Sequence, residues 1–133
     1  MQCMKSLWLI LMVLCGTLFS SSQTADFPDT SGNAFMRLCS VIDKQDQNNS
    51  DANHAMACIG YVSGFTSGVE FGTAFVEDKA GKKVRGPFCR PDEVENGQLI
   101  RVALKFIRDN PERAHQPTSW LLMDAFGKAY PCK

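Results

Sequence analysis

Cys58 and His54 are the two side chains whose types and spacing could support catalysis. They lie four residues apart, so a helix would place them on one face, where an imidazole could take the proton of a thiol nucleophile. A thiol attacks a substrate only while it is free, and a disulfide-bonded sulfur lacks that reactivity. Because the chain offers Cys58 other cysteines as partners, we expect it to be bonded, and we predict no catalytic residue.

Motifs that hold phosphates, metals or an activated serine are absent from the sequence. It has no glycine-rich phosphate loop, no Gly-x-Ser-x-Gly elbow and no closely spaced His and Glu ligands. The second histidine, His115, lies in a polar turn before Pro117, where capping or bridging the turn is the usual role. We therefore predict no metal, no cofactor and no enzymatic activity.

The first 22 residues have the three-part layout of a secretory signal peptide. Lys5 supplies the positive start, an apolar run continues through Phe19, and a serine triplet at 20–22 offers small residues for cleavage. We expect a signal peptide at 1–22 and one exported domain at 23–133. An uncleaved membrane anchor is the alternative, although the apolar run is short for crossing a bilayer.

Four cysteines would remain after such a cleavage, and an even number in a small exported domain indicates two disulfides. Zinc is the alternative, but structural zinc ligands usually include close Cys-x-x-Cys pairs, which this chain lacks. Three pairings are possible. We favour Cys58–Cys89 with Cys39–Cys132, because the second bridge would tie the C-terminus back to the first helix of the domain.

The charges of the chain balance, with 14 basic and 14 acidic residues. A nucleic-acid-binding domain obtains most of its affinity from a basic surface, so nucleic acid is excluded as the expected partner. The same balance gives no reason to expect a membrane surface as a partner after the signal peptide has been removed.

Apolar spacing predicts about four helices and little strand, which makes the fold class an all-α, disulfide-stapled bundle. The helices are expected within 32–43, 55–76 and around 99–107, and after Pro117. Asn110-Pro111 should end the third helix, because the residue before a proline disfavours the helical conformation. Between the second and third helices, 77–87 is predicted to be a charged loop or a short hairpin.

The segment 55–76 is unusual because its only charged residue is Glu70 and glycines recur at every fourth position. Its polar residues favour a buried central helix over a membrane helix. Each glycine costs a helix about 1 kcal/mol relative to alanine, so the stripe predicts close approach of another backbone. A kink or break beyond Phe71 is the alternative. Glu70, if buried, would pair with Lys or Arg of another helix. The stripe consists of Gly60, Gly64, Gly68 and Gly72.

Two groups of basic residues are candidates for a protein-docking surface, although such residues are more often only solvated. One group lies in the loop after the second helix, where exposed loops commonly carry recognition. The other lies on the polar face of the third helix. The expected partner-binding residues are Lys79, Lys82, Lys83, Arg85, Arg101, Lys105 and Arg108.

Four short motifs resemble the Rap/Tai immunity proteins of type VI secretion. Cys58–Gly64 is similar to their Cys-x-Gly-Tyr-x-x-Gly motif, and Phe88–Pro91 is similar to their Phe-Cys-x-Pro element. The stretch 98–117 resembles their Leu-rich helix with its Pro-Glu…His-x-Pro turn, and 129–132 resembles their closing aromatic-Pro-Cys. The motifs occur in order across nearly the whole expected domain. Ser67 departs from the pattern, since the family often has an acidic residue there.

This resemblance implies a small helical periplasmic protein, usually dimeric, that protects the cell wall. Family members bind a peptidoglycan amidase delivered by a type VI secretion system and occlude its active-site cleft stoichiometrically, which requires no catalytic residue. The resemblance therefore implies an amidase effector and a second copy of the chain as partners. The alternative is a periplasmic structural or chaperone-like module that binds many clients weakly through apolar surface and has no toxin partner.

Overall fold

The computed structural model describes residues 29–133, and the signal peptide predicted at 1–22 lies outside this part of the chain. Within the described residues there are four α-helices, one short 3-10 helix and no strand, only an isolated bridge between Ser31 and Pro117. The all-α prediction is confirmed. The elements are α2 (Gly32–Cys39), α3 (Asn49–Ala80), α4 (Asn96–Asp109), η1 (Pro111–Arg113) and α5 (Thr118–Ala129).

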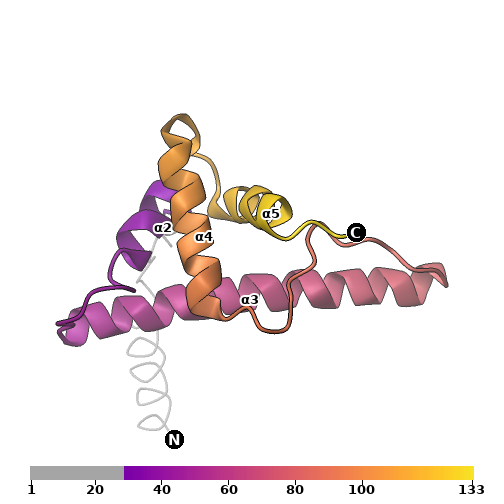
Figure 1. Ribbon diagram of the computed structural model, residues 1–133, viewed down its shortest axis with the longest axis horizontal. Coiled ribbons are helices and arrows are strands. Elements are labelled where there is room, and N and C mark those ends of the chain that lie inside the picture. Colours follow the sequence, from indigo (N-terminus) through magenta and orange to yellow (C-terminus); the bar gives the residue numbers. More distant parts are fainter. Residues whose placement is uncertain (1–28) are drawn as a thin grey trace, which may run out of the picture.

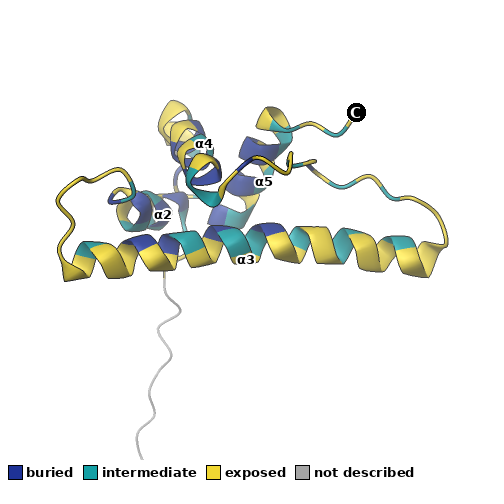
Figure 2. Ribbon diagram, turned by 60° about the horizontal axis from the view of Figure 1, so that its bottom comes forward, coloured by how far each residue is buried: buried dark blue, intermediate teal, exposed yellow. Residues whose placement is uncertain are grey.

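The long helix α3 forms the base of the molecule, and α2, α4 and α5 gather against part of one side of it (Figure 1). Its buried residues are Ala55, Cys58, Val62 and Thr66, all in its first eighteen positions. The C-terminal part of α3 extends beyond the other helices, and Figure 2 shows it mostly exposed. The prediction of a buried central helix is thus correct for the first half of α3 and wrong for the second.

Both ends of α3 are set by residues close to them. At the start, Asn48 accepts the Asp51 N–H at 2.9 Å while the Asp51 carboxylate accepts the Asn48 N–H at 3.2 Å, a reciprocal capping box. At the end, Gly81 has a φ of 62°, the left-handed conformation that glycine adopts without strain. The alternatives of a break beyond Phe71 and of a hairpin are therefore wrong. No helix within residues 29–133 has the length and hydropathy needed to cross a membrane.

The core lies between α4, α5 and the first half of α3. Phe88, from the segment before α4, packs edge-on against Phe126 of α5 with 5.4 Å between ring centroids. Asn110 ends α4 in front of Pro111, as predicted. The largest side chains that are fully buried are Val62, Leu99, Ile100, Ile107, Leu121, Leu122 and Phe126.

The structure contains two disulfides, Cys39–Cys58 and Cys89–Cys132. The pairing that we favoured from the sequence is therefore wrong, although all four cysteines are bonded. The physical reason is the path of the chain. Cys39 ends α2 directly beside α3, whereas α3 continues 22 residues past Cys58, so the returning chain meets the C-terminal tail at Cys89.

Candidate protein-docking surface

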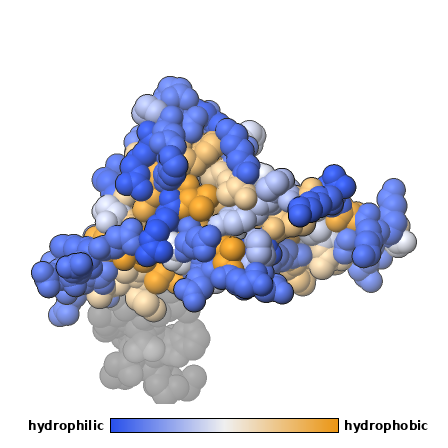
Figure 3. Space-filling view, in the orientation of Figure 1, coloured by the Kyte–Doolittle hydropathy of each residue, from blue (hydrophilic) through white to orange (hydrophobic). Residues whose placement is uncertain are grey.

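The basic loop that follows α3 lies at the end of the molecule farthest from α2 (Figure 1). Its cationic side chains are all exposed, and Figure 3 shows hydrophilic surface over this end. Lys79 lies in the last turn of α3, with its ammonium 5.5 Å from the centre of the Phe75 ring. We call this surface the basic tip, and it consists of Lys79, Lys82, Lys83 and Arg85.

The chain that leaves the basic tip runs back along α3 and contacts it at three positions. The Glu77 carboxylate accepts the Val84 N–H at 2.9 Å. One turn lower, Gly86 lies so close to Thr73 that a Cβ on Gly86 would be 3.5 Å from the threonine hydroxyl. Next, the guanidinium of Arg90 lies 3.4 Å from the Glu70 carboxylate. We call residues 84–90 the return segment.

The base of the return segment is anchored in the core. Cys89 is bonded to Cys132, and its N–H donates to the Tyr130 carbonyl at 2.8 Å. Phe88 is buried between Phe65 and Phe126, with its ring nearly parallel to that of Phe65. Contacts along α3 and a disulfide below it therefore hold the basic tip in one geometry, which limits the entropy lost when a partner binds.

The second basic group, on α4, does not share a surface with the basic tip. Arg101 pairs with Asp43 at 2.8 Å, in the turn that follows α2. Lys105 pairs with Asp109 on its own helix at 2.7 Å, and the Arg108 Nε donates to the Leu104 carbonyl at 3.1 Å. Since the loop after α2 and the basic tip lie at opposite sides of α4 (Figure 1), the seven predicted residues form two separate surfaces.

Glu70 is half-exposed and pairs with Arg90 of the return segment. The expectation of a cation from another helix applied to a buried Glu70, a condition that the structure does not meet. This pairing could not be read from the sequence, because it depends on the chain folding back over α3.

The His54–Cys58 pair cannot act as a base and nucleophile, because the Cys58 sulfur is bonded to Cys39. His54 is exposed on the first turns of α3, and His115 is exposed in the turn after η1. Residues 29–133 contain no group of three or more His, Cys, Asp or Glu side chains placed to hold a metal ion.

The glycine stripe of α3 faces away from the other described residues. A Cβ built on Gly60, Gly64, Gly68 or Gly72 would meet no atom of residues 29–133 within 4 Å. The predicted close approach of another backbone to these glycines is therefore not found among residues 29–133. The apolar residues that pack α3 against the core lie on the opposite side of the helix, at Ala55, Cys58 and Val62.

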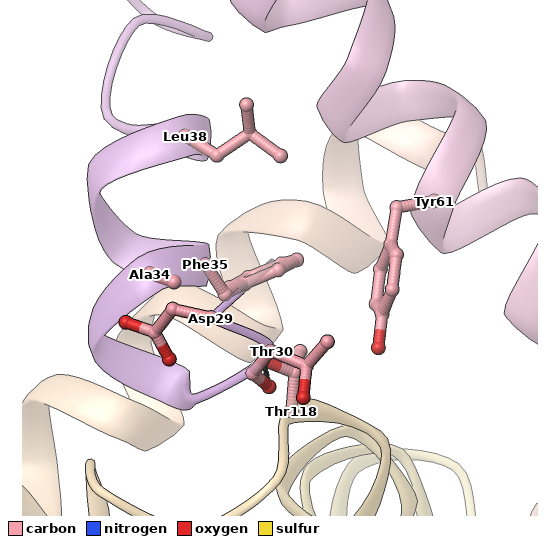
Figure 4. Close-up of a pocket in the computed structure, with 7 residues that line it drawn as sticks. All are labelled: Asp29, Thr30, Ala34, Phe35, Leu38, Tyr61 and Thr118. Carbon is pink, nitrogen blue, oxygen red and sulfur yellow. Dashed lines mark hydrogen bonds between the residues drawn. The ribbon is translucent and has the colours of Figure 1, made fainter. Parts of the chain in front are cut away.

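An apolar hollow lies between α2, α3 and the start of α5, and no sequence pattern indicated it. Phe35 and Leu38 of α2 line one side and Tyr61 of α3 lines the other, with Asp29 and Thr118 at the rim (Figure 4). The rings of Phe35 and Tyr61 are 6.1 Å apart between centroids. Partial burial raises the pKa of the Tyr61 hydroxyl above its usual value, so the phenol stays neutral and can donate a hydrogen bond.

The residues from Ser31 to Cys132 include every helix described above and all four bonded cysteines. The sequence model of the Rap1a immunity proteins matches this same stretch, residues 31–132. The chain belongs to the Rap1a immunity protein family. No curated protein and no solved structure matches it.

The features shared with the Rap1a family have distinct places in the fold. Cys58 of the Cys-x-Gly-Tyr motif bridges α3 to α2, and Tyr61 of the same motif lines the hollow. Cys89 of the Phe-Cys-x-Pro element anchors the return segment. These motif residues hold the scaffold of this Rap1a protein together, whereas the basic tip lies between the motifs.

Proposed function

We propose that this protein is a periplasmic immunity protein that binds a peptidoglycan amidase delivered by a type VI secretion system. On this proposal it occludes the active-site cleft of the amidase and so protects the cell wall. The observation that carries the proposal is membership of the Rap1a immunity family over residues 31–132. The homodimer implied by the resemblance is part of the same proposal.

The basic tip is the surface we propose to enter or cover the cleft. It projects from the body on the end of α3, and its four cations favour a partner with an acidic surface. The contacts of Glu77 and Glu70 with the return segment order the loop before binding, which lowers the entropic cost of forming the complex. Occlusion needs tight binding alone, so the proposal requires no enzymatic activity.

The α4 group remains a second candidate contact, at Arg101, Lys105 and Arg108. Two of these cations already face carboxylates of the same chain. A partner would have to displace or share those carboxylates, so we assign this group less of the binding energy than the basic tip.

The proposed location follows from the predicted signal peptide at 1–22 together with the two disulfides. Disulfides persist in oxidising compartments such as the bacterial periplasm and are rare in the cytosol. A protein located there would meet an effector before it reaches the wall.

Binding to the amidase encoded by a neighbouring gene tests the proposal. Oxidised protein is titrated into the amidase in a calorimeter at low and at high salt. We expect a tight complex whose affinity falls as salt increases, since the basic tip supplies much of the attraction. An adjacent amidase that shows no binding heat and no co-elution would refute the immunity function.

A chaperone-like role is the second candidate, and the exposed apolar side chains favour it. Trp120 is 71% exposed and Phe71 is 72% exposed, which is the kind of surface that binds unfolded clients weakly. To discriminate between the two functions, the aggregation of several unrelated reduced proteins is measured with and without this protein. We expect none, and broad suppression without a tight effector complex would support the chaperone-like role instead.

A further inference from the structure

The two disulfides differ in their exposure to solvent. Cys39 and Cys58 are both fully buried, with 0% of each residue exposed. Cys89 is exposed, and Cys132 is half-buried. Thiol–disulfide exchange requires a thiolate to reach one of the two bonded sulfurs, so access decides which bridge reacts while the protein is folded. Of the two bridges, Cys89–Cys132 meets this condition.

The C-terminal tail, which carries Cys132, docks at a free-energy cost. The tail consists of residues 130–133, which alternate between half-buried and exposed (Figure 2). The Tyr130 hydroxyl is buried and has no hydrogen-bond partner among residues 29–133. An unsatisfied buried hydroxyl opposes docking of its side chain, because the group loses its hydrogen bonds to water. Breaking the bridge would therefore favour release of the tail into solvent.

The same bridge is the covalent link at the base of the return segment. Between Cys89 and the basic tip, the segment contacts α3 through the Glu70–Arg90 ion pair and the hydrogen bond from the Val84 N–H to Glu77. The carboxylate of Glu70 is half-exposed, and exposed ion pairs contribute little to stability. Without the bridge, weak contacts would thus hold the chain that leaves the basic tip.

We propose that Cys89–Cys132 is a thiol–disulfide exchange site for a dithiol reductant, and that its opening releases the C-terminal tail and loosens the basic tip. A dithiol reductant is a molecule with two neighbouring thiols. Cys39–Cys58 stays closed, because both of its cysteines lie within the core. The fold around α4 and α5 therefore persists while the basic tip loses its order.

The exchange proceeds in two steps. A thiolate of the reductant attacks the exposed Cys89 sulfur, forms a mixed disulfide there and expels Cys132 as a thiolate, which takes a proton from water. The Cys132 sulfur lies 3.5 Å from the Gly86 carbonyl, to which the new thiol can donate a hydrogen bond. The second thiolate of the reductant then attacks its own bonded sulfur and expels Cys89, which is protonated in turn. The bridge gains two electrons, and the reductant loses two and becomes a disulfide.

Selective reduction of the native protein tests the proposal, with Cys39–Cys58 of the same molecule as the internal control. Oxidised protein is incubated with dithiothreitol, free thiols are trapped with N-ethylmaleimide, and peptide mass spectrometry quantifies each pair over time. We expect Cys89–Cys132 to open at least about tenfold faster than Cys39–Cys58, while the helical circular dichroism is retained. In concentrated urea, where burial is lost, the two rates should converge. Equal rates in the folded protein, or a rate ratio that urea leaves unchanged, would overturn the proposal.

Hydrogen exchange of the opened protein tests the consequence for the basic tip. We expect the amides of Val84 and Cys89 to exchange at least about tenfold faster than in the oxidised protein, whereas those of α4 keep their protection. The double variant Cys89→Ser with Cys132→Ser reproduces the open form without a reductant and should show the same pattern, unaltered by dithiothreitol. Unchanged exchange at Val84 and Cys89 in both open forms would overturn control of the tip by the bridge.

The inference rests on the proposed function only for its effect on partner binding. The open form should bind the neighbouring-gene amidase about tenfold or more weakly, since ordering the tip then costs entropy. Selective opening is measured without any amidase, so the two failures are distinguishable. A protein that opens selectively but binds no amidase in either form refutes only the immunity function, and equal affinity of the oxidised and open forms overturns the control of binding by the bridge.

Discussion

The carboxylate of Glu77 accepts the backbone N–H of Val84 at 2.9 Å, across the bend where α3 ends and the chain turns back. A side chain in the last turns of the helix thus caps the first residue of the return segment. Three residues of the bend, 81–83, lie between the end of α3 at Ala80 and Val84. The basic tip is therefore ordered by contacts that lie outside the hydrophobic core.

Replacing Glu77 by alanine should loosen the basic tip while leaving the fold intact. The Val84 amide loses its acceptor, and a hydrogen bond to a charged group is worth roughly 1.5 kcal/mol, so its hydrogen exchange should accelerate about tenfold. Asp78→Ala, one residue along α3, serves as the control. Equal protection of Val84 in both variants would show that Glu77 does not order the loop.

The two disulfides should differ in their contribution to stability. Their cysteines are separated by 19 and 43 residues, and the chain-entropy model gives about 3 and about 4 kcal/mol for loops of those lengths. We measure the free energy of unfolding by urea denaturation. Replacing Cys89 and Cys132 by serine should lower it more than replacing Cys39 and Cys58 by serine. Non-reducing peptide mapping checks the pairing itself, and a Cys58–Cys89 peptide would contradict the structure.

The helix cap of α3 makes a pH-dependent contribution to stability. Hydrogen bonds from Lys44 and from the Asn48 N–H lower the pKa of Asp51 below its ordinary value of 3.8. A carboxyl with a lowered folded pKa stabilises the fold above its unfolded pKa, and this contribution disappears as the pH falls through the folded value.

We therefore expect acidification from pH 5 to below 3.8 to cost the native protein more stability than the Asp51→Asn variant. Urea unfolding at a series of pH values measures the difference. Asp46→Asn, which removes the same charge from an exposed aspartate outside the cap, is the matched control. Identical slopes for the native protein and Asp51→Asn would contradict the role of the cap.

Replacing a buried aromatic residue should lower the free energy of unfolding much more than replacing an exposed one. Phe126 is fully buried against Phe88, so Phe126→Ala should cost about 3–5 kcal/mol. Trp120→Ala removes a side chain that is 71% exposed and should change stability by less than about 0.5 kcal/mol. Chemical denaturation compares the two, and a large loss for Trp120→Ala would place that ring in the core.

The helices around the core could be predicted from the sequence because their signals are local. The apolar spacing of Leu99, Phe106 and Ile107 marks the buried face of α4, and Pro111 marks its end. The end of α3 was missed because its last turns contact water and carry no apolar pattern. Gly81 was the available signal, since a glycine after a charged helical turn is typical of a left-handed cap.

The disulfide pairing and the Glu70–Arg90 and Glu77–Val84 contacts could not be predicted, because each depends on the return path of the chain over α3. The glycine stripe shows a different limit. The four-residue spacing places the glycines along one side of α3. Spacing alone does not say whether that side faces the core or the surface.

Inhibition of the neighbouring-gene amidase by the oxidised protein tests the central claim most directly. Peptidoglycan cleavage is followed while the protein is titrated in, after sedimentation has established the assembly state of each variant. We predict complete inhibition at one protein chain per amidase and a loss of about tenfold or more in potency for Lys82→Glu, Lys83→Glu and Arg85→Glu combined. Reversal of Arg101, Lys105 and Arg108 should reduce potency less. Undiminished cleavage at excess native protein would contradict the account.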